Sequence, residues 1–256
     1  MIDPRAIIDP SAVIGENVSI GPWTIVGADV EVGDNTVINS HVVVKGPARI
    51  GKNNRIFQFS TIGEDTPDLK YKGEATRLII GDNNTIREGV TIHRGTVQDK
   101  AETRIGDNNL LMAYVHIGHD CVVGSNCILV NNASLAGHVV MGDWAILSGY
   151  VLVHQFVSIG VHAFAGAGTF LTHDLPPYVM AMGSPAEART INAEGLKRRD
   201  FSRQQIAAIN QAYKIIYRRG LKLAEAIAEL DAMTDEVEVI QPLADFLRQS
   251  SRGIVR

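Results

Sequence analysis

Residues 112 to 156 read M-A-Y-V-H-I-G-H-D-C-V-V-G-S-N-C-I-L-V-N-N-A-S-L-A-G-H-V-V-M-G-D-W-A-I-L-S-G-Y-V-L-V-H-Q-F, and this stretch decides the fold. An apolar side chain stands at every sixth position, from Ile117 through to Val153. A period of six matches neither the 3.6-residue period of a helix nor the two-residue alternation of a strand. It is typical of a parallel β-helix, in which each hexad forms one flat side of a triangular coil.

Three such sides close one coil, so residues 18 apart lie one above the other at about 4.8 Å. This spacing predicts spatial neighbours from the sequence alone. Gly137 follows His119 by 18 residues and Gln155 follows Gly137 by 18, which places the three in one column. Asp120 and His138 are also 18 apart and form a second column beside the first.

The same period extends over most of the chain. Apolar residues keep the sixth positions in 2–62, 80–92 and 105–171, with interruptions at about 64–79 and 96–104. The repeats that flank the first interruption are 18 residues apart, so we expect this stretch to replace one coil as a projecting loop. Long loops on a rigid scaffold often carry function.

Glycine follows the apolar residue in many of these hexads, for example at Gly15 and Gly51. A residue without Cβ adopts tight backbone conformations most easily. We therefore expect these glycines to bend the chain at the corners of the coil.

The repeat ends near residue 185, because proline cannot donate a hydrogen bond to a sheet ladder. The prolines at this end are Pro176, Pro177 and Pro185. Beyond them the apolar residues recur at helical spacing, and the segment 202–205 has the pattern of a helix capping box. We predict a mainly β protein with a β-helix domain at 1–185 and an α-helical domain at 186–256 that covers the open end of the coil.

The composition argues against several classes of protein. A net charge of -4 and a pI near 6.1 argue against general nucleic-acid binding, which needs a basic surface. We find no signal-peptide pattern and no apolar run long enough for a transmembrane helix, so we expect a cytoplasmic protein. Cys121 and Cys127 are expected to be buried, free thiols.

Four histidines interrupt the apolar scaffold: His116, His119, His138 and His154. A single histidine is most often structural, but four in one short stretch of a regular coil favour a functional site. An imidazole has an unperturbed pKa near 6.5 and is suited to general base catalysis. We expect His162 and His173 to be structural or surface residues.

These motifs resemble the bacterial UDP-N-acetylglucosamine O-acyltransferases over essentially the whole chain. The resemblance rests on H-I-G-H-D-C (116–121), N-N-A-S-L-A-G-H (131–138), V-H-Q-F (153–156), I-N-A-E-G-L-K-R-R (191–199), D-L-K-Y (68–71) and T-I-H-R-G-T (91–96). It implies a homotrimer of left-handed β-helices that needs no metal or other cofactor. The family moves an (R)-3-hydroxyacyl chain from acyl carrier protein to the 3-hydroxyl of UDP-N-acetylglucosamine, at the start of lipid A biosynthesis.

The resemblance also implies roles for individual residues. His119 is the general base, Asp120 orients it, and the backbone N–H of Gly137 receives the oxyanion. The implied ligands of the sugar and acyl groups are Asp68, Lys70, His93, His116, His138, His154 and Gln155. The implied nucleotide ligands, supplied by a neighbouring subunit, are Asn192, Glu194 and Arg198.

Ala167 matches the position that limits acyl-chain length in this family, where glycine leaves room and methionine blocks the channel. Alanine departs from both choices and adds one methyl group to glycine. We therefore expect chains of about 12 to 14 carbons to be preferred, since each buried methylene contributes roughly 0.8 kcal/mol.

Three other functions compete with this one. A zinc site of the carbonic-anhydrase kind would use His116, His119 and His138, although the histidine spacing of five typical of those proteins is absent. The related N-acyltransferase of the same pathway carries an additional N-terminal domain, whereas here the hexads begin at Ile2. The third alternative is a purely structural solenoid.

The helical region is locally basic in an acidic protein. Its cations include Lys197, Arg198, Arg203, Lys214, Arg218, Arg219 and Lys222. Such a cluster is either a solvated helix face or a dock for an acidic partner such as acyl carrier protein.

Overall fold

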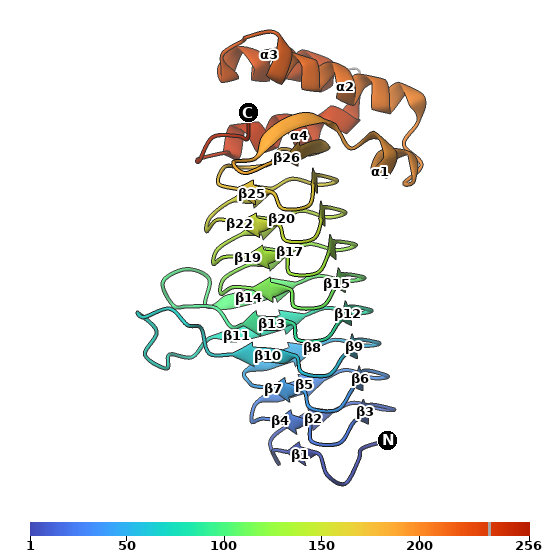
Figure 1. Ribbon diagram of the computed structural model, residues 1–256, viewed down its shortest axis with the longest axis vertical. Coiled ribbons are helices and arrows are strands. Elements are labelled where there is room, and N and C mark those ends of the chain that lie inside the picture. Colours follow the sequence, from blue (N-terminus) through green and yellow to red (C-terminus); the bar gives the residue numbers. More distant parts are fainter. Residues whose placement is uncertain (235–236) are drawn as a thin grey trace.

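A long three-sided coil is the main feature of the computed structural model, which describes residues 1–234 and 237–256 (Figure 1). Three parallel sheets form the sides, here named face 1, face 2 and face 3, and the chain visits them in that order. Most coils contain 18 residues, so that Ile7 pairs with Ile25 and His116 with Ser134. The predicted left-handed parallel β-helix, followed by helices, is confirmed.

The strands are short, and each face stacks one from every coil. Face 1 contains β1 (Ile7–Ile8), β4 (Ile25–Val26), β7 (Val43–Val44), β10 (Thr61–Glu64), β13 (Thr91–His93), β16 (His116–Ile117), β19 (Ser134–Leu135), β22 (Leu152–Val153) and β25 (Phe170–Leu171). Face 2 contains β2 (Val13–Ile14), β5 (Val30–Val32), β8 (Ala48–Ile50), β11 (Arg77–Ile80), β14 (Glu102–Ile105), β17 (Val122–Val123), β20 (Val140–Met141) and β23 (Ser158–Ile159). Face 3 contains β3 (Ser19–Ile20), β6 (Val37–Ile38), β9 (Arg55–Ile56), β12 (Thr85–Ile86), β15 (Leu110–Leu111), β18 (Ile128–Leu129), β21 (Ile146–Leu147), β24 (Phe164–Ala165), β26 (Val179–Met182) and β27 (Glu187–Ile191).

The sixth-position residues form the core along the axis of the coil. Ile56, Ile62 and Ile92 are completely buried, and each contributes roughly 1.5–3 kcal/mol by leaving water. The residue before each of them points outward, because successive side chains of a strand alternate between its two faces. The regular spacing of the apolar side chains therefore fixes which residues remain available for a surface site.

At most corners the chain does not bend at the glycine, so that expectation is wrong there; Gly63, with φ 76°, is an exception. The bend lies two residues later, where Asn17 has φ 56° after Gly15 and Asn53 has φ 57° after Gly51. A Cβ on Gly15 would lie 2.8 Å from the backbone nitrogen of Asp34 in the next coil. These glycines therefore allow the coils to stack closely, while mostly Asn, Asp, His and aromatic residues adopt the left-handed conformation.

Both interruptions leave the coil at the edge between face 1 and face 2. The expectation that 64–79 replaces a coil is wrong, because β10 on face 1 and β11 on face 2 are successive sides of one coil. The second loop joins β13 to β14 across the same edge, one coil further along. Figure 1 shows the two loops projecting together from one side of the molecule.

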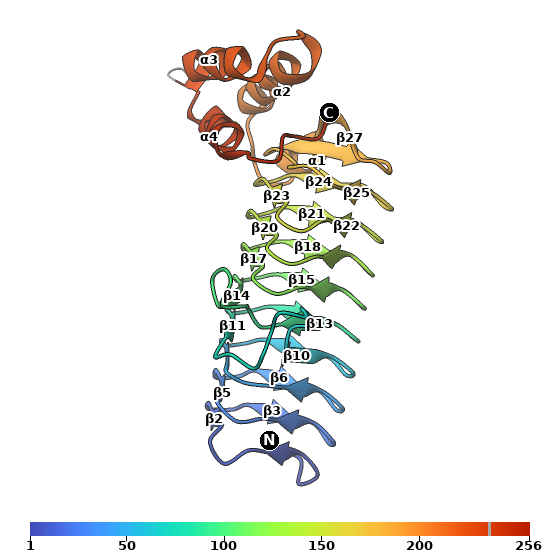
Figure 2. The ribbon, with the colours of Figure 1, turned by 90° about the vertical axis from the view of Figure 1, so that its left-hand side faces the viewer.

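The C-terminal region covers one end of the coil (Figure 2). It begins with β27, a strand that the sequence did not predict and that pairs antiparallel with β26. The helices are α1 (Ala193–Lys197), α2 (Arg203–Arg218), α3 (Leu223–Thr234), η1 (Glu238–Ile240) and α4 (Gln241–Gln249). The capping box predicted at Ser202 is present and starts α2. The domain division after residue 185 stays a prediction, since β27 continues face 3 beyond it.

None of the helices in the described part of the chain is long and apolar enough to cross a membrane. Cys121 and Cys127 are free and completely buried, as expected. Burial raises the pKa of each thiol to about 12.

Candidate active site

His119 and Asp120 form a hydrogen-bonded pair at the edge between face 1 and face 2. Nδ1 of His119 lies 2.9 Å from Oδ2 of Asp120, whose side chain is completely buried. Thr96, from the second loop, donates its backbone N–H at 2.9 Å and its hydroxyl at 2.6 Å to the same carboxylate oxygen. Burial alone would raise the pKa of Asp120, but these hydrogen bonds from His119 and Thr96 outweigh it and hold the pKa below its usual value. The carboxylate is therefore ionised and fixed.

The imidazole of His119 lies directly against Gly137 of the next coil, as the 18-residue spacing predicts. A Cβ on residue 137 would lie 2.6 Å from both Cε1 and Nε2 of this ring, so only glycine leaves room for it. Within the described residues, the backbone N–H of Gly137 has no acceptor. A free N–H donor therefore lies beside the free nitrogen of a histidine whose other nitrogen is held by a carboxylate.

His138 occupies the second predicted column, above Asp120. Its backbone N–H donates to the carbonyl of His119 at 2.9 Å, and its Nδ1 lies 4.0 Å from Oδ2 of Asp120. A closer partner is Asp99 of the second loop, whose Oδ2 lies 2.8 Å from Nδ1. Phe156 of the following coil stacks on the imidazole at 4.2 Å between ring centroids. The ring is therefore fixed at its nitrogen and on one face.

Further predicted residues lie on face 1. Nδ1 of His116 shares a hydrogen bond of 2.8 Å with the hydroxyl of Thr91 in the preceding coil. The centroid of its ring lies 5.3 Å from that of His93. Burial, reinforced by His93 and His119, lowers the pKa of His116 to about 4, so this imidazole is neutral at physiological pH. A cavity of about 420 Å³ on the same face is lined by His116, His154 and Gln155, with Leu152 and Phe170 as its apolar wall.

A second cavity, of about 500 Å³, opens on the other side of the edge. Asp68 and Lys70 of the first loop line it together with Asp99, His138 and other residues. His119 and Gly137 thus lie on the edge between two cavities, one beside the loops and one on face 1. The six predicted ligands Asp68, Lys70, His116, His138, His154 and Gln155 all line one cavity or the other.

The remaining predicted residues lie on other edges of the same chain. Asn192 is buried at the start of α1 and donates to the carbonyl of His162, between face 2 and face 3. Glu194 and Arg198 are exposed on the same short helix. Ala167 is exposed at the edge between face 3 and face 1. Within one chain, the residues around His119, the predicted nucleotide ligands and Ala167 therefore lie on three different edges of the coil. The sequence prediction places all of them in one site.

Comparison with known proteins identifies the family. A family model described as UDP N-acetylglucosamine O-acyltransferase, domain 2, matches residues 174–255, and one described as bacterial transferase hexapeptide (six repeats) matches 11–46 and 102–137. An acyl-[acyl-carrier-protein]–UDP-N-acetylglucosamine O-acyltransferase of Stutzerimonas stutzeri is 60% identical over 256 residues, covering 100% of this chain and 99% of the relative. The protein of the same name from Pseudomonas putida is 63% identical over 259 residues, with the same coverage. The chain belongs to the UDP-N-acetylglucosamine O-acyltransferase family.

Solved structures of this family have the same fold. The UDP-N-acetylglucosamine acyltransferase of Francisella novicida superposes with a TM-score of 0.98 at 45% identity, covering 100% of this chain and 94% of that one. The enzyme of the same name from Campylobacter jejuni gives 0.94 at 36% identity, with 100% of both chains covered.

Sequence reasoning missed the contribution of the second loop. It treated 96–104 as an interruption of the repeat, whereas Thr96 holds Asp120 and Asp99 holds His138. The two separations, 24 and 39 residues, are not multiples of 18, so the coil arithmetic could not find these contacts. The only available signal was that the loop leaves the coil one turn before the histidines.

His162, expected to be structural or at the surface, lies in an aromatic cluster near α1. Its ring stacks with Trp144 and Tyr178 and meets Phe201 edge-on. Burial, aided by Arg199, lowers the pKa of His162 to about 4. These contacts support a structural role for this imidazole.

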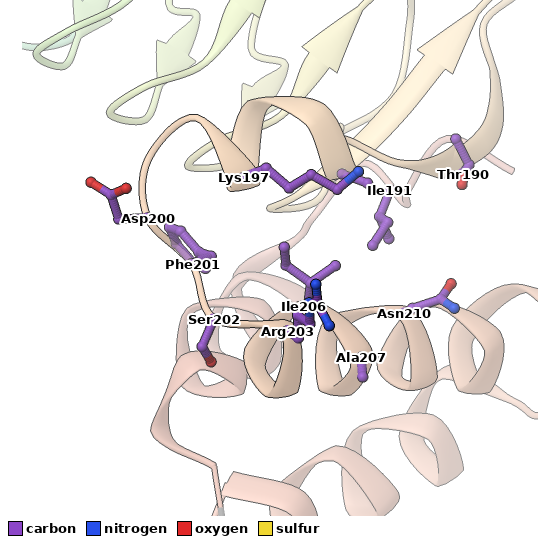
Figure 3. Close-up of a pocket in the computed structure, with 11 residues that line it drawn as sticks. Thr190, Ile191, Lys197, Asp200, Phe201, Ser202, Arg203, Ile206, Ala207 and Asn210 are labelled. Carbon is purple, nitrogen blue, oxygen red and sulfur yellow. The ribbon is translucent and has the colours of Figure 1, made fainter.

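A larger cavity, of about 850 Å³, lies between α1 and α2, far along the chain from His119 (Figure 3). Its lining includes Ile191, Phe201 and Ile206, with Lys197 and Arg203 at its sides. No predicted site residue lines it, so volume alone does not locate the chemistry.

The zinc alternative does not fit the observed geometry. The cluster of possible ligands is His119, Asp120 and His138, without His116, and their ligand atoms lie within 4.8 Å of one another. The three histidines named for the zinc alternative therefore do not form one cluster within the described residues.

Proposed function

We propose that this chain transfers an (R)-3-hydroxyacyl group from acyl carrier protein to the 3-hydroxyl of UDP-N-acetylglucosamine, the first step of lipid A biosynthesis. The observation that carries the proposal is the position of the carboxylate-bound His119 against Gly137, a residue whose backbone N–H has no acceptor within the described residues. Full-length identity to O-acyltransferases supports the same activity over the related N-acyltransferase.

Asp120 determines the direction of proton transfer. It accepts the Nδ1–H of His119, which leaves Nε2 unprotonated and able to take a proton from the sugar hydroxyl. The hydroxyl oxygen then attacks the thioester carbonyl and forms a C–O bond. The resulting oxyanion receives a hydrogen bond from Gly137 N–H, a contribution of roughly 3–4 kcal/mol for one such donor. The intermediate collapses, the C–S bond breaks, and the carrier sulfur leaves with the proton held by His119.

The acyl group passes directly between the substrates in this proposal. Cys121 and Cys127 are completely buried, and their raised pKa values keep both thiols protonated. Because the thiolate is the nucleophilic form, neither is suited to form an acyl-enzyme.

In this proposal one cavity binds the sugar and the other binds the acyl chain. Asp68, Lys70 and His138 offer polar groups to the sugar in the loop cavity. The cavity on face 1 offers Leu152 and Phe170 to the acyl chain, with His116, His154 and Gln155 at its polar end. His93 lies beside His116 and completes this group. The location of the reaction, in this proposal, is the cytoplasm.

A homotrimer completes the site. Asn192, Glu194 and Arg198 lie on a different edge of the coil from His119, so only a neighbouring subunit can bring them to the nucleotide. Ala167 lies on a third edge, where a neighbour would form the opposite wall of the acyl channel. We also infer that the basic surface of α2 docks acyl carrier protein, because Lys214 and Arg218 are exposed on it.

The test is transfer of a radiolabelled hydroxyacyl chain from its carrier protein to UDP-N-acetylglucosamine. Product labelled on the 3-hydroxyl supports the activity, whereas label on another hydroxyl or no transfer contradicts it.

A complementation experiment tests the shared site. Subunits with His119→Ala and subunits with Arg198→Ala are each expected to be inactive, and they are co-expressed in equal amounts. In a cyclic trimer with shared sites, about three quarters of the assemblies contain both kinds of subunit. Each of these mixed trimers has one intact site out of three, so about a quarter of the native activity should return. No recovery in mixed trimers would place both residues in a site of one chain.

A further inference from the structure

The loop between β13 and β14 supplies a second carboxylate–histidine pair that no residue role above includes. Oδ2 of Asp99 lies 2.8 Å from Nδ1 of His138, and the same carboxylate binds Nζ of Lys100 at 3.0 Å. Burial would raise the pKa of Asp99, but the hydrogen bonds from His138 and Lys100 hold it below its usual value. The pair therefore repeats, one coil away, the arrangement of His119 and Asp120.

The loop is braced, so Asp99 is presented at a fixed position. Its backbone N–H and that of Ala101 both donate to the carbonyl of Thr96, at 3.3 and 2.9 Å. The carbonyl of Ala101 in turn accepts from Arg77 N–H at 2.9 Å. Thr96 is itself bound to the buried Asp120. This chain of contacts ties the loop to the catalytic corner.

Asp120 does not take the place of Asp99. It lies 4.0 Å from Nδ1 of His138, and its oxygens already receive His119 and Thr96. Phe156 stacks on one face of His138, and the ring of His119 lies perpendicular to it at 4.8 Å between centroids. The imidazole of His138 is therefore fixed in position. Whether it donates or accepts a hydrogen bond toward the cavity depends on which of its two nitrogens carries the proton.

We propose that Asp99 is a positioning residue that holds His138 as the Nδ1–H tautomer, so that Nε2 accepts a hydrogen bond from a hydroxyl of the sugar acceptor. A free neutral imidazole prefers the proton on Nε2, so the carboxylate is needed to reverse this preference. The identity of the hydroxyl as that of UDP-N-acetylglucosamine rests on the proposed function; the tautomer does not.

The tautomer is measured by long-range ¹H–¹⁵N NMR on protein labelled at its histidines, with His138 assigned from the signals lost in His138→Gln. The native protein is expected to show Nδ1–H and Asp99→Ala to show Nε2–H. Asp99→Asn keeps a carbonyl oxygen that accepts from Nδ1–H and should retain the native tautomer. Asp34→Ala, which removes a carboxylate paired with Lys52 in a distant coil, is the matched control and should leave the spectrum unchanged.

Kinetics distinguish positioning from a purely structural role. Asp99→Ala should raise the KM for UDP-N-acetylglucosamine about tenfold, the effect of one hydrogen bond, and change kcat by less than about threefold. Asp99→Asn should restore most of the native KM. Retention of Nδ1–H in Asp99→Ala, or a native KM in that variant, would overturn the proposal. A native enzyme that makes no acylated UDP-N-acetylglucosamine would instead refute the proposed function, and the NMR result would still decide the tautomer.

Discussion

Gly137→Ala tests the contact between His119, the proposed base, and the neighbouring coil. The backbone φ of Gly137 is outside the left-handed region, so alanine fits the chain itself. The added methyl group would lie 2.6 Å from Nε2 and Cε1 of His119. The variant keeps the backbone N–H proposed for the oxyanion, so its effect reports on the position of the imidazole.

The geometry sets the size of the effect. Non-bonded heavy atoms normally approach to about 3.5 Å, so the ring must retreat by roughly 0.9 Å from the methyl carbon. Asp120, which is itself held by Thr96, binds Nδ1 on the other side of His119 and leaves the ring little room to move. Misplacing a catalytic group by about 1 Å costs about 100-fold in rate, which corresponds to roughly 2.7 kcal/mol of transition-state stabilisation.

The measurement is kcat for hydroxyacyl transfer with both substrates saturating, together with a thermal melt to verify the fold. We expect kcat to fall about 100-fold and the KM for UDP-N-acetylglucosamine to change little. Gly149→Ala is the matched control, because Gly149 occupies the same place in its hexad and its Cβ would meet its nearest atom, Asn131 O, at an ordinary 3.5 Å. This control should keep native activity.

A folded Gly137→Ala enzyme with native kcat would refute the reasoning. It would mean that His119 retreats without losing its alignment, and hence that contact with Gly137 does not position the base. Equal losses in both variants would instead point to a general effect of crowding the corners.

Four further predictions follow from the same structure. His119→Ala should abolish nearly all transfer while the protein stays folded, and substantial residual turnover would exclude His119 as the base. Folding lowers the pKa of His116 from 6.5 to about 4. Its contribution to stability is therefore complete above pH 6.5 and declines as the pH falls toward 4. His116→Gln should therefore reduce the loss of unfolding free energy between about pH 7 and pH 5, measured in urea. Charge reversal at Arg218 and Arg219 should raise the KM for the carrier protein in a salt-dependent way, mainly through Arg218, since Arg219 already pairs with Glu229. Ala167→Met should shift the preferred acyl chain from 12–14 toward about ten carbons in competition assays, and a ten-carbon preference in the native enzyme would exclude Ala167 as the ruler.

The periodic part of the site was predictable because the coil is regular. An 18-residue spacing placed His119 against Gly137 and Asp120 below His138, and the structure confirms both contacts. The loop contacts were not predictable, because seven residues are inserted there between two sides of one coil. Thr96 belongs to this loop and contacts Asp120 outside the regular repeat. The strand β27 was missed for a similar reason: it pairs antiparallel after a turn, outside the repeat.

The left-handed corner explains how two consecutive residues can form the proposed catalytic pair. Successive side chains of a strand point to opposite faces, which would separate His119 from Asp120. Asp120 has φ 58°, and this turn places its carboxylate beside the preceding imidazole while its own side chain is buried. Asn and Asp tolerate this conformation better than most residues, and Asn fills the same corner position at Asn126 and Asn132. Asp120→Asn therefore leaves the corner intact but removes the charge and one of the two oxygens that accept from Thr96 and His119. Its loss of activity should be smaller than that of His119→Ala and should measure the contribution of the carboxylate itself.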